Sequence, residues 1–189
     1  KPWHRFDANI DYRLVYSTRP HNSHPNYIFK LDDDLWVTRC TQEDAVNLTD
    51  VSQRIDISGQ DAISVHDGLL WKDTVVFTRV DGYLVLCDQK TKQVTEVIDP
   101  FDKSKSRPVG WCRGLCIDGD IFYIGYSKLR KTKLKDKLKF LAQGNVKYTS
   151  GNNALVVAYN MKSAQVENTY ETPDQVLDAI YGILPFHYD

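Results

Sequence analysis

The sequence predicts an all-β fold, specifically a β-propeller with about four blades visible in the chain. The first observation is an internal repeat: similar runs of β-forming residues begin at His24, His66 and Cys112, 42 and then 46 positions apart. Units of about 40–45 residues with several short strands are typical of propeller blades. The second observation is that short strands follow one another without intervening helices. This succession favours meandering antiparallel sheets over alternating strands and helices.

The individual strands are delimited by alternation of apolar and polar residues and by runs of β-branched and aromatic residues. In chain order they are expected at 11–17, 26–31, 34–40, 45–49, 53–57, 67–71, 73–79, 83–88, 92–98, 113–118, 120–126, 154–159, 164–169 and 176–183. Short polar turns separate them, and Asp81-Gly82 marks the clearest hairpin. We expect residues 1–189 to form a single propeller domain or a propeller fragment.

Residues 128–152 interrupt the repeat and are predicted to be an insertion between the second and third strands of one blade. The segment 128–139 carries seven basic residues and one acidic residue. Three leucines, Leu134, Leu138 and Leu141, recur at helical spacing, so the insertion is expected to contain one short basic helix. Removing the insertion from the 66 residues between Cys112 and Asp178 restores the repeat spacing.

The strand count leaves the closure of the ring open. The expected strands make about three and a half four-stranded blades, whereas the smallest propellers have about four. In one interpretation the strand Asp11–Ser17 pairs with the final blade around Val176–Ile183 and closes a four-bladed ring. In the other, which the sequence favours, the chain is part of a larger ring whose missing blades come from a removed segment or from another chain. The chain begins with Lys1 and its only methionine is Met161, which is typical of a processed or trimmed sequence.

Composition describes an ordinary globular protein, with 42% hydrophobic residues, 26% charged residues and a net charge of −1. No apolar run reaches membrane-spanning length and no signal-peptide pattern opens the chain, so a cytoplasmic location is expected. The four cysteines are therefore predicted to be buried thiols. The basic segment contains few aromatic residues on which bases would stack, so nucleic acid is not an expected partner.

Polar residues at the starts of the innermost strands are the candidate site. In a propeller these strands line the central channel, so their first residues converge at one mouth. The candidate ligand-binding residues are His24, Asn26, His66, Asp67, Arg113 and Asp178. They predict a site for a small polar or anionic ligand, because the forked guanidinium of Arg113 suits a carboxylate, phosphate or sulfate.

Three alternatives stay open for these residues. His24 and His66 with a carboxylate form a donor set that suits a divalent ion such as Zn²⁺, Mn²⁺ or Fe²⁺, and a His–Asp pair suits acid–base chemistry of a hydrolase or lyase. Adjacent residues of a strand face opposite sides, so His66 and Asp67 share the channel only where the strand begins in a turn. Otherwise Asp67 holds the turn. In the third alternative the whole set hydrogen-bonds between blades and caps backbone groups at the channel entrance, with Arg113 paired to Asp178 or Asp67. Phosphate-loop, nucleophile-elbow and HExxH motifs are absent from the sequence.

A different class of function comes from the basic segment. A lysine-rich helix with a leucine stripe is typical of segments that bind an anionic surface or a protein. The alternative to a ligand-binding propeller is therefore a non-catalytic scaffold that binds its partner through residues 128–139.

Three stretches also carry a resemblance to a known family. They read HPNYIFKLDDDLWVTRC, VHDGLLWKDTVVFTRVDGYLVLCD and GWCRGLCIDGDIFYIGYSKLR within residues 22–130, with DAIYGILPF near the end. With these stretches the chain resembles a poorly characterised bacterial family of β-propeller-like proteins, distantly similar to NHL-repeat proteins. The resemblance implies a propeller fold and chains longer than 189 residues. It implies no particular activity and no role for the basic insertion.

Overall fold

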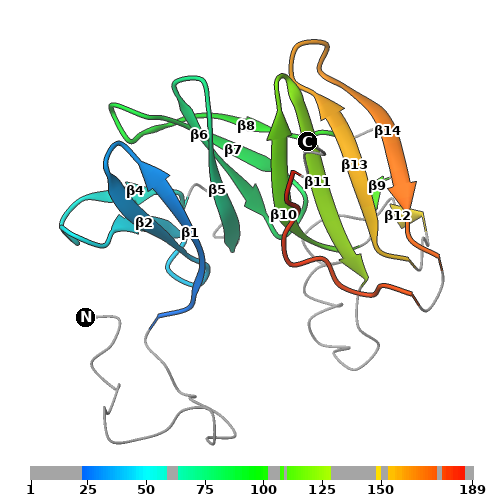
Figure 1. Ribbon diagram of the computed structural model, residues 1–189, viewed down its shortest axis with the longest axis horizontal. Helices are drawn as coiled ribbons and strands as arrows, with labels where there is room; N and C mark the ends of the chain where they lie inside the picture. The colour runs from blue at the N-terminus through cyan, green and yellow to red at the C-terminus, as the bar shows by residue number, and fades with distance from the viewer. Residues whose placement is uncertain are drawn as a thin grey trace, which may run out of the picture.

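The computed structural model describes residues 23–58, 64–101, 107–108, 110–128, 148–149, 153–173 and 176–185. Three four-stranded antiparallel sheets stand side by side, coloured blue to cyan, green, and yellow-green to orange (Figure 1). The first sheet contains β1 (Pro25–Leu31), β2 (Asp34–Arg39), β3 (Asp44–Asn47) and β4 (Arg54–Asp56). The second contains β5 (Val65–Trp71), β6 (Thr74–Arg79), β7 (Leu84–Asp88) and β8 (Val94–Ile98). The third contains β10 (Gly110–Asp118), β11 (Ile121–Lys128), β13 (Leu155–Asn160) and β14 (Gln165–Glu171).

Each sheet is a meander in which spatial order follows chain order. In the third sheet β11 pairs directly with β13, and the chain between them contributes β12 (Tyr148–Thr149), which pairs in parallel with β9 (Arg107–Pro108). The first strand of the second sheet, β5, contacts both β1 and β10, so the first strands of the sheets are neighbours. The all-β class and the succession of antiparallel meanders are confirmed, and three four-stranded units lie among the described residues.

Two apolar clusters lie between the sheets. One joins the first and second sheets, where the rings of Phe29 and Phe77 meet edge to face with centroids 5.8 Å apart. The other joins the second and third sheets, where Trp71 meets Phe122 at 5.3 Å. Consecutive strand residues face opposite sides, so Val75 lies in the first cluster and Val76 in the second. The two middle strands of the second sheet, β6 and β7, are therefore buried on both faces, which explains their continuous apolar runs.

The first strand of every sheet carries a β-bulge at the repeat recognised in the sequence. The register shifts between Pro25 and Tyr27, between His66 and Leu69, and between Cys112 and Leu115. A bulge inserts an extra residue and redirects the neighbouring side chains. The repeated sequence elements therefore encode a distortion that aims polar side chains at the end of each first strand.

One expected strand is not formed, and two other expected elements lie outside the described residues. Residues 176–183 were expected to form a strand, but within the described 176–185 the chain runs as irregular backbone beside the third sheet. The physical reason is that a strand needs a paired neighbour for its backbone groups, and no described strand pairs with this segment. The expected strand 11–17 and the basic helix, from residue 129 onward, lie outside the described residues.

All four cysteines are buried free thiols, as expected. In the part of the chain that the structure describes, no helix is long and apolar enough to cross a membrane.

Candidate functional site

Buried hydroxyl groups near the ends of the second strands bind either Asp67 or the segment that follows the third sheet. Near the end of β2, Thr38 Oγ1 donates to the carbonyl oxygen of Asp67 at 2.5 Å. In the third sheet, Ser127 Oγ donates to the carbonyl oxygen of Ile180 at 3.0 Å. In the second sheet, the Thr78 hydroxyl donates to the Asp67 carboxylate. These hydroxyls belong to no motif in the sequence, although each precedes a basic residue at the end of a second strand.

Asp67 connects all three sheets. Its residue is 2% exposed, and its carboxylate accepts the Gly114 N–H, 3.0 Å from Oδ2, in addition to the Thr78 hydroxyl. Burial raises the pKa of Asp67, and the hydrogen bonds from Thr78 and Gly114 partly oppose that shift. The backbone of Asp67 has φ of 56°, which belongs to the bulge. Its contacts therefore support the turn-holding role that the sequence left open.

Basic residues end the second strand of each sheet, and carboxylates pair with them. The pairs are Arg39 with Asp44, Arg79 Nη2 with Asp81 Oδ2 at 2.6 Å, and Lys128 Nζ with Asp178 Oδ1 at 3.5 Å. The predicted site residue Asp178 is thus an exposed partner of Lys128, and the structure shows no contact between it and the other candidates. These three cations are neutralised by the fold itself.

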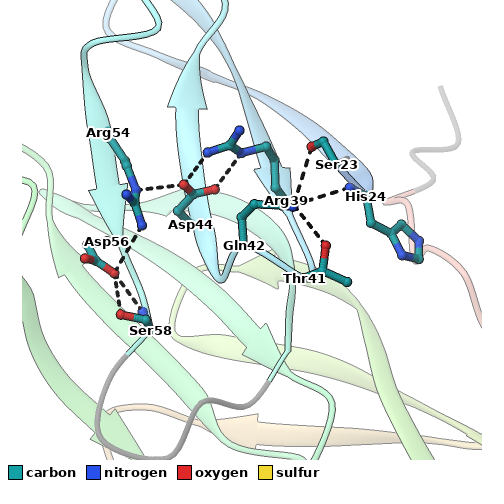
Figure 2. A network of polar contacts seen from close by, with 9 residues as sticks. All are labelled: Ser23, His24, Arg39, Thr41, Gln42, Asp44, Arg54, Asp56 and Ser58. Carbon is teal, nitrogen blue, oxygen red and sulfur yellow. Dashed lines mark hydrogen bonds and ion pairs between the residues drawn. The ribbon is translucent and has the colours of Figure 1, made fainter. Parts of the chain in front are cut away.

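Figure 2 shows the most extensive of these pairings, in the first sheet. The fully buried Asp44 carboxylate accepts from Arg39 Nε at 2.7 Å and from Arg54 Nε at 2.7 Å. Beside it, the Gln42 side-chain oxygen accepts the His24 backbone N–H at 3.3 Å. The His24 ring points away from this network (Figure 2). Its charge lowers the pKa of His66, so the two rings lie close enough to interact.

Arg113 differs from the other cations at this end of the sheets. It lies in the bulge of β10, and no carboxylate among the described residues forms an ion pair with it. Its Nε is buried without a hydrogen-bond partner among the described residues. Its guanidinium carbon lies 4.2 Å from the centroid of the Tyr181 ring. Its charge lowers the pKa of His66 and opposes the rise at Asp67, which places it beside both.

The hydrogen bonds of His66 assign its proton. Asn26 Nδ2 lies 3.1 Å from the Val65 carbonyl oxygen and 2.5 Å from His66 Nδ1. An amide nitrogen that donates to that carbonyl also presents a donor to Nδ1, so Nδ1 accepts and the neutral ring carries its proton on Nε2. Nε2 lies 3.7 Å from Cys40 Sγ. The Asn26 side-chain oxygen is left buried with no partner among the described residues.

This tautomer argues against nucleophilic catalysis by Cys40. A cysteine, a histidine and an asparagine follow one another here, as in some thiol hydrolases. A protonated Nε2 cannot accept the thiol proton, however, and burial raises the pKa of Cys40. Burial together with the charges of Arg113 and His24 lowers the pKa of His66 to about 4, far from a general base poised near neutrality. The arrangement suits recognition of a ligand better than proton transfer.

Among the described residues no third side chain joins His24 and His66 as a metal ligand. Among the described residues no group of three His, Cys, Asp or Glu side chains could hold a metal ion. A divalent ion at these histidines therefore stays a prediction.

Comparison with known proteins adds little to this geometry. No model of a protein family matches the chain, so the resemblance to NHL-repeat relatives gains no support. No curated protein matches it either. Among solved structures it is similar to the dihydro-heme d1 dehydrogenase NirN, solved in complex with DHE, at 10% identity and a TM-score of 0.45. That similarity covers 80% of this chain and 29% of NirN, and we carry nothing from NirN to this site.

The lowered pKa of His66 predicts that the stability of the protein depends on pH. Because the pKa of His66 falls from 6.5 to about 4 on folding, the unfolded chain binds this proton more tightly than the native protein. Stability from His66 is therefore complete above pH 6.5 and is lost as pH falls toward 4, by up to about 3 kcal/mol. Urea unfolding at pH 7 and pH 4.5, compared with His66→Gln, measures this loss. An NMR titration in which the His66 ring titrates near its ordinary pKa would contradict it.

Proposed function

We propose that this chain binds a small anionic ligand at the end of the three sheets where Arg113 lies. The observation that supports this most is the contrast among four cations: Arg39, Arg79 and Lys128 are each paired with a carboxylate, whereas Arg113 pairs with none among the described residues. A partly buried guanidinium without a carboxylate is a strong site for a carboxylate or phosphate, because charge-assisted forked hydrogen bonds are worth more than neutral ones.

Neighbouring groups fit a ligand that carries a donor as well as a charge. The buried Asn26 side-chain oxygen would accept from a ligand hydroxyl or amine. Neutral His66 contacts Asn26 and is close enough to Arg113 for that charge to lower its pKa, so it adds polarity without a competing positive charge. The proposed ligand is therefore a hydroxy- or amino-substituted anion at one mouth of a propeller channel.

The scaffold function and metal-assisted hydrolysis have no supporting observation among the described residues. The basic segment beyond Lys128 lies outside the described residues, so no observation favours the scaffold function. Metal-assisted hydrolysis has no third ligand among the described side chains. We propose binding without assigning a reaction.

Arg113→Gln tests the proposal. A panel of sodium acetate, lactate, phosphate and sulfate is screened for a rise in melting temperature above that produced by sodium chloride of equal ionic strength. For the best probe, calorimetry should show that Arg113→Gln weakens binding about tenfold to a hundredfold, since a hydrogen bond to a charged group contributes about 1.5–3 kcal/mol. Arg113→Lys should retain part of the affinity, because it keeps the charge and loses the fork.

Lys72→Gln is the matched control. Lys72 follows the far end of β5 and pairs with Asp120 at 2.9 Å, so it carries the same charge at the opposite end of the first strands. Its loss should leave the affinity unchanged. The proposal is wrong if no probe stabilises the protein beyond the chloride salt, or if Lys72→Gln and Arg113→Gln weaken binding equally.

A further inference from the structure

The segment after the third sheet is anchored at its backbone. Ser127 Oγ accepts the Ile180 N–H at 2.9 Å and donates to the Ile180 carbonyl oxygen at 3.0 Å. The Lys128 N–H donates to the Asp178 carbonyl oxygen at 2.8 Å. Figure 1 shows this red segment passing along the third sheet toward β10. The residue that follows Ile180 is therefore held in a defined place although it belongs to no strand.

Two glycines make room for the anchor. A Cβ at Gly125 would lie 2.7 Å from Ile180 Cγ2, and a Cβ at Gly114 would lie 3.1 Å from the same atom. Ile180 fills this space and is only 6% exposed. Packing and hydrogen bonding together keep the segment against the innermost hairpin of the third sheet.

Tyr181 emerges from this anchored segment onto Arg113. Its ring lies 4.2 Å from the Arg113 guanidinium carbon, yet the residue is 64% exposed. A guanidinium stacked on an aromatic face fixes the orientation of both groups, and the cation–π interaction stabilises this arrangement. The ring of a largely exposed residue is thus oriented directly beside the cation that has no carboxylate partner among the described residues.

The sequence places Tyr181 in series with two residues already described. Asp67-Gly68, Arg113-Gly114 and Tyr181-Gly182 each put a side chain immediately before a glycine in successive repeats. Asp67 links the sheets and Arg113 supplies the charge. Tyr181, at the third position, supplies an exposed ring that the apolar core does not use.

We propose that Tyr181 is a specificity-determining residue of the anion site and selects ligands whose carboxylate is attached to an aromatic ring. The carboxylate contacts Arg113, and the ligand ring stacks on the exposed surface of Tyr181. This inference rests on the proposed function, because it needs Arg113 to bind the anion. Offset or edge-to-face contact between aromatic rings adds attraction that a saturated ring of similar size does not provide.

The test compares benzoate with cyclohexanecarboxylate, which share charge and approximate size and differ in aromaticity. Wild-type protein should bind benzoate about threefold to tenfold more tightly by calorimetry. Tyr181→Leu should bring that ratio close to one, while Tyr181→Phe should preserve it. Tyr181 is exposed, so both variants should keep the wild-type melting temperature, which confirms that they fold.

The outcomes separate this inference from the proposed function. If both carboxylates bind through Arg113 with equal affinity, or if Tyr181→Leu keeps the preference, the role of Tyr181 is wrong and the anion site stands. If neither carboxylate binds and no inorganic anion does, the anion site itself is wrong. Arg113→Gln should weaken both probes by the same factor, since both present the same carboxylate.

Discussion

Asp67→Ala is expected to lower the free energy of unfolding by about 3–5 kcal/mol, because two buried donors lose their acceptor and each costs about 1–3 kcal/mol. The Gly114 N–H and the Thr78 hydroxyl would remain in the interior without the carboxylate that receives them. The φ of 56° at this residue adds strain for alanine, whereas aspartate and asparagine tolerate it better. Because the Asp67 carboxylate lies between the sheets, its removal is expected to loosen the packing of the sheets against one another.

Asp67→Asn is the matched control for that loss. Asparagine keeps one side-chain oxygen and the tolerance for positive φ, so it should cost less than half as much as alanine. Urea unfolding followed by tryptophan fluorescence measures both variants against the wild type. A cost below about 1 kcal/mol for Asp67→Ala would show that Asp67 does not hold the sheets together.

The same pair of variants has a defined pH dependence. Burial raises the pKa of Asp67 above 3.8, so the native protein binds this proton more tightly than the unfolded chain does. The contribution of Asp67 is then fully present below pH 3.8 and decreases as pH rises through the native pKa. Asp67→Asn should remove that component from the stability profile, because its side chain does not titrate.

Gly68→Ala is expected to cost about 3 kcal/mol or more, through overpacking and backbone strain together. A Cβ at this position would lie 2.6 Å from Phe29 Cδ1, and the φ of 155° belongs to a region that glycine alone adopts readily. Phe29 is buried and packs edge-on against Phe77, so it has little room to yield. Thermal and urea unfolding measure the loss.

Gly119→Ala separates strain from overpacking. Gly119 also has positive φ, 59°, but a Cβ there would meet nothing within 4 Å. Alanine at this turn should therefore cost only about 1–2 kcal/mol, the penalty of the left-handed conformation. Equal losses for the two variants would mean that contact with Phe29 contributes nothing.

Several features of the fold follow from local sequence alone. Alternation and turn chemistry located the twelve strands of the three large sheets to within three residues at each end, because strand residues alternate between faces and polar turns must separate them. The repeat at His24, His66 and Cys112 coincides with the first strand of each sheet, where the register shifts. The free buried thiols also followed from composition and context.

Long-range contacts decided the roles of the site residues. The sequence alone ranks Asp67 and Asp178 with Arg113 as candidate ligand-binding residues. The bulge turns Asp67 toward Thr78 and Gly114, and the anchored final segment takes Asp178 to Lys128. None of these three partners lies within ten residues of its carboxylate in the sequence, so no local pattern reveals which carboxylate is paired and which cation has no carboxylate partner among the described residues.

The segment around Tyr181 also shows what the local sequence does not determine. Its segment reads as a strand because it alternates, yet the structure leaves it irregular and anchored through Ser127 and Ile180. Alternation reports which faces a chain can present, whereas the hydrogen-bond partners of its backbone depend on what tertiary packing brings beside it. The sequence by itself thus determined the sheets and the order of their strands. Only the tertiary structure decided which polar residues pair with one another among the described residues, because burial and pairing of charge are properties of contacts between distant segments.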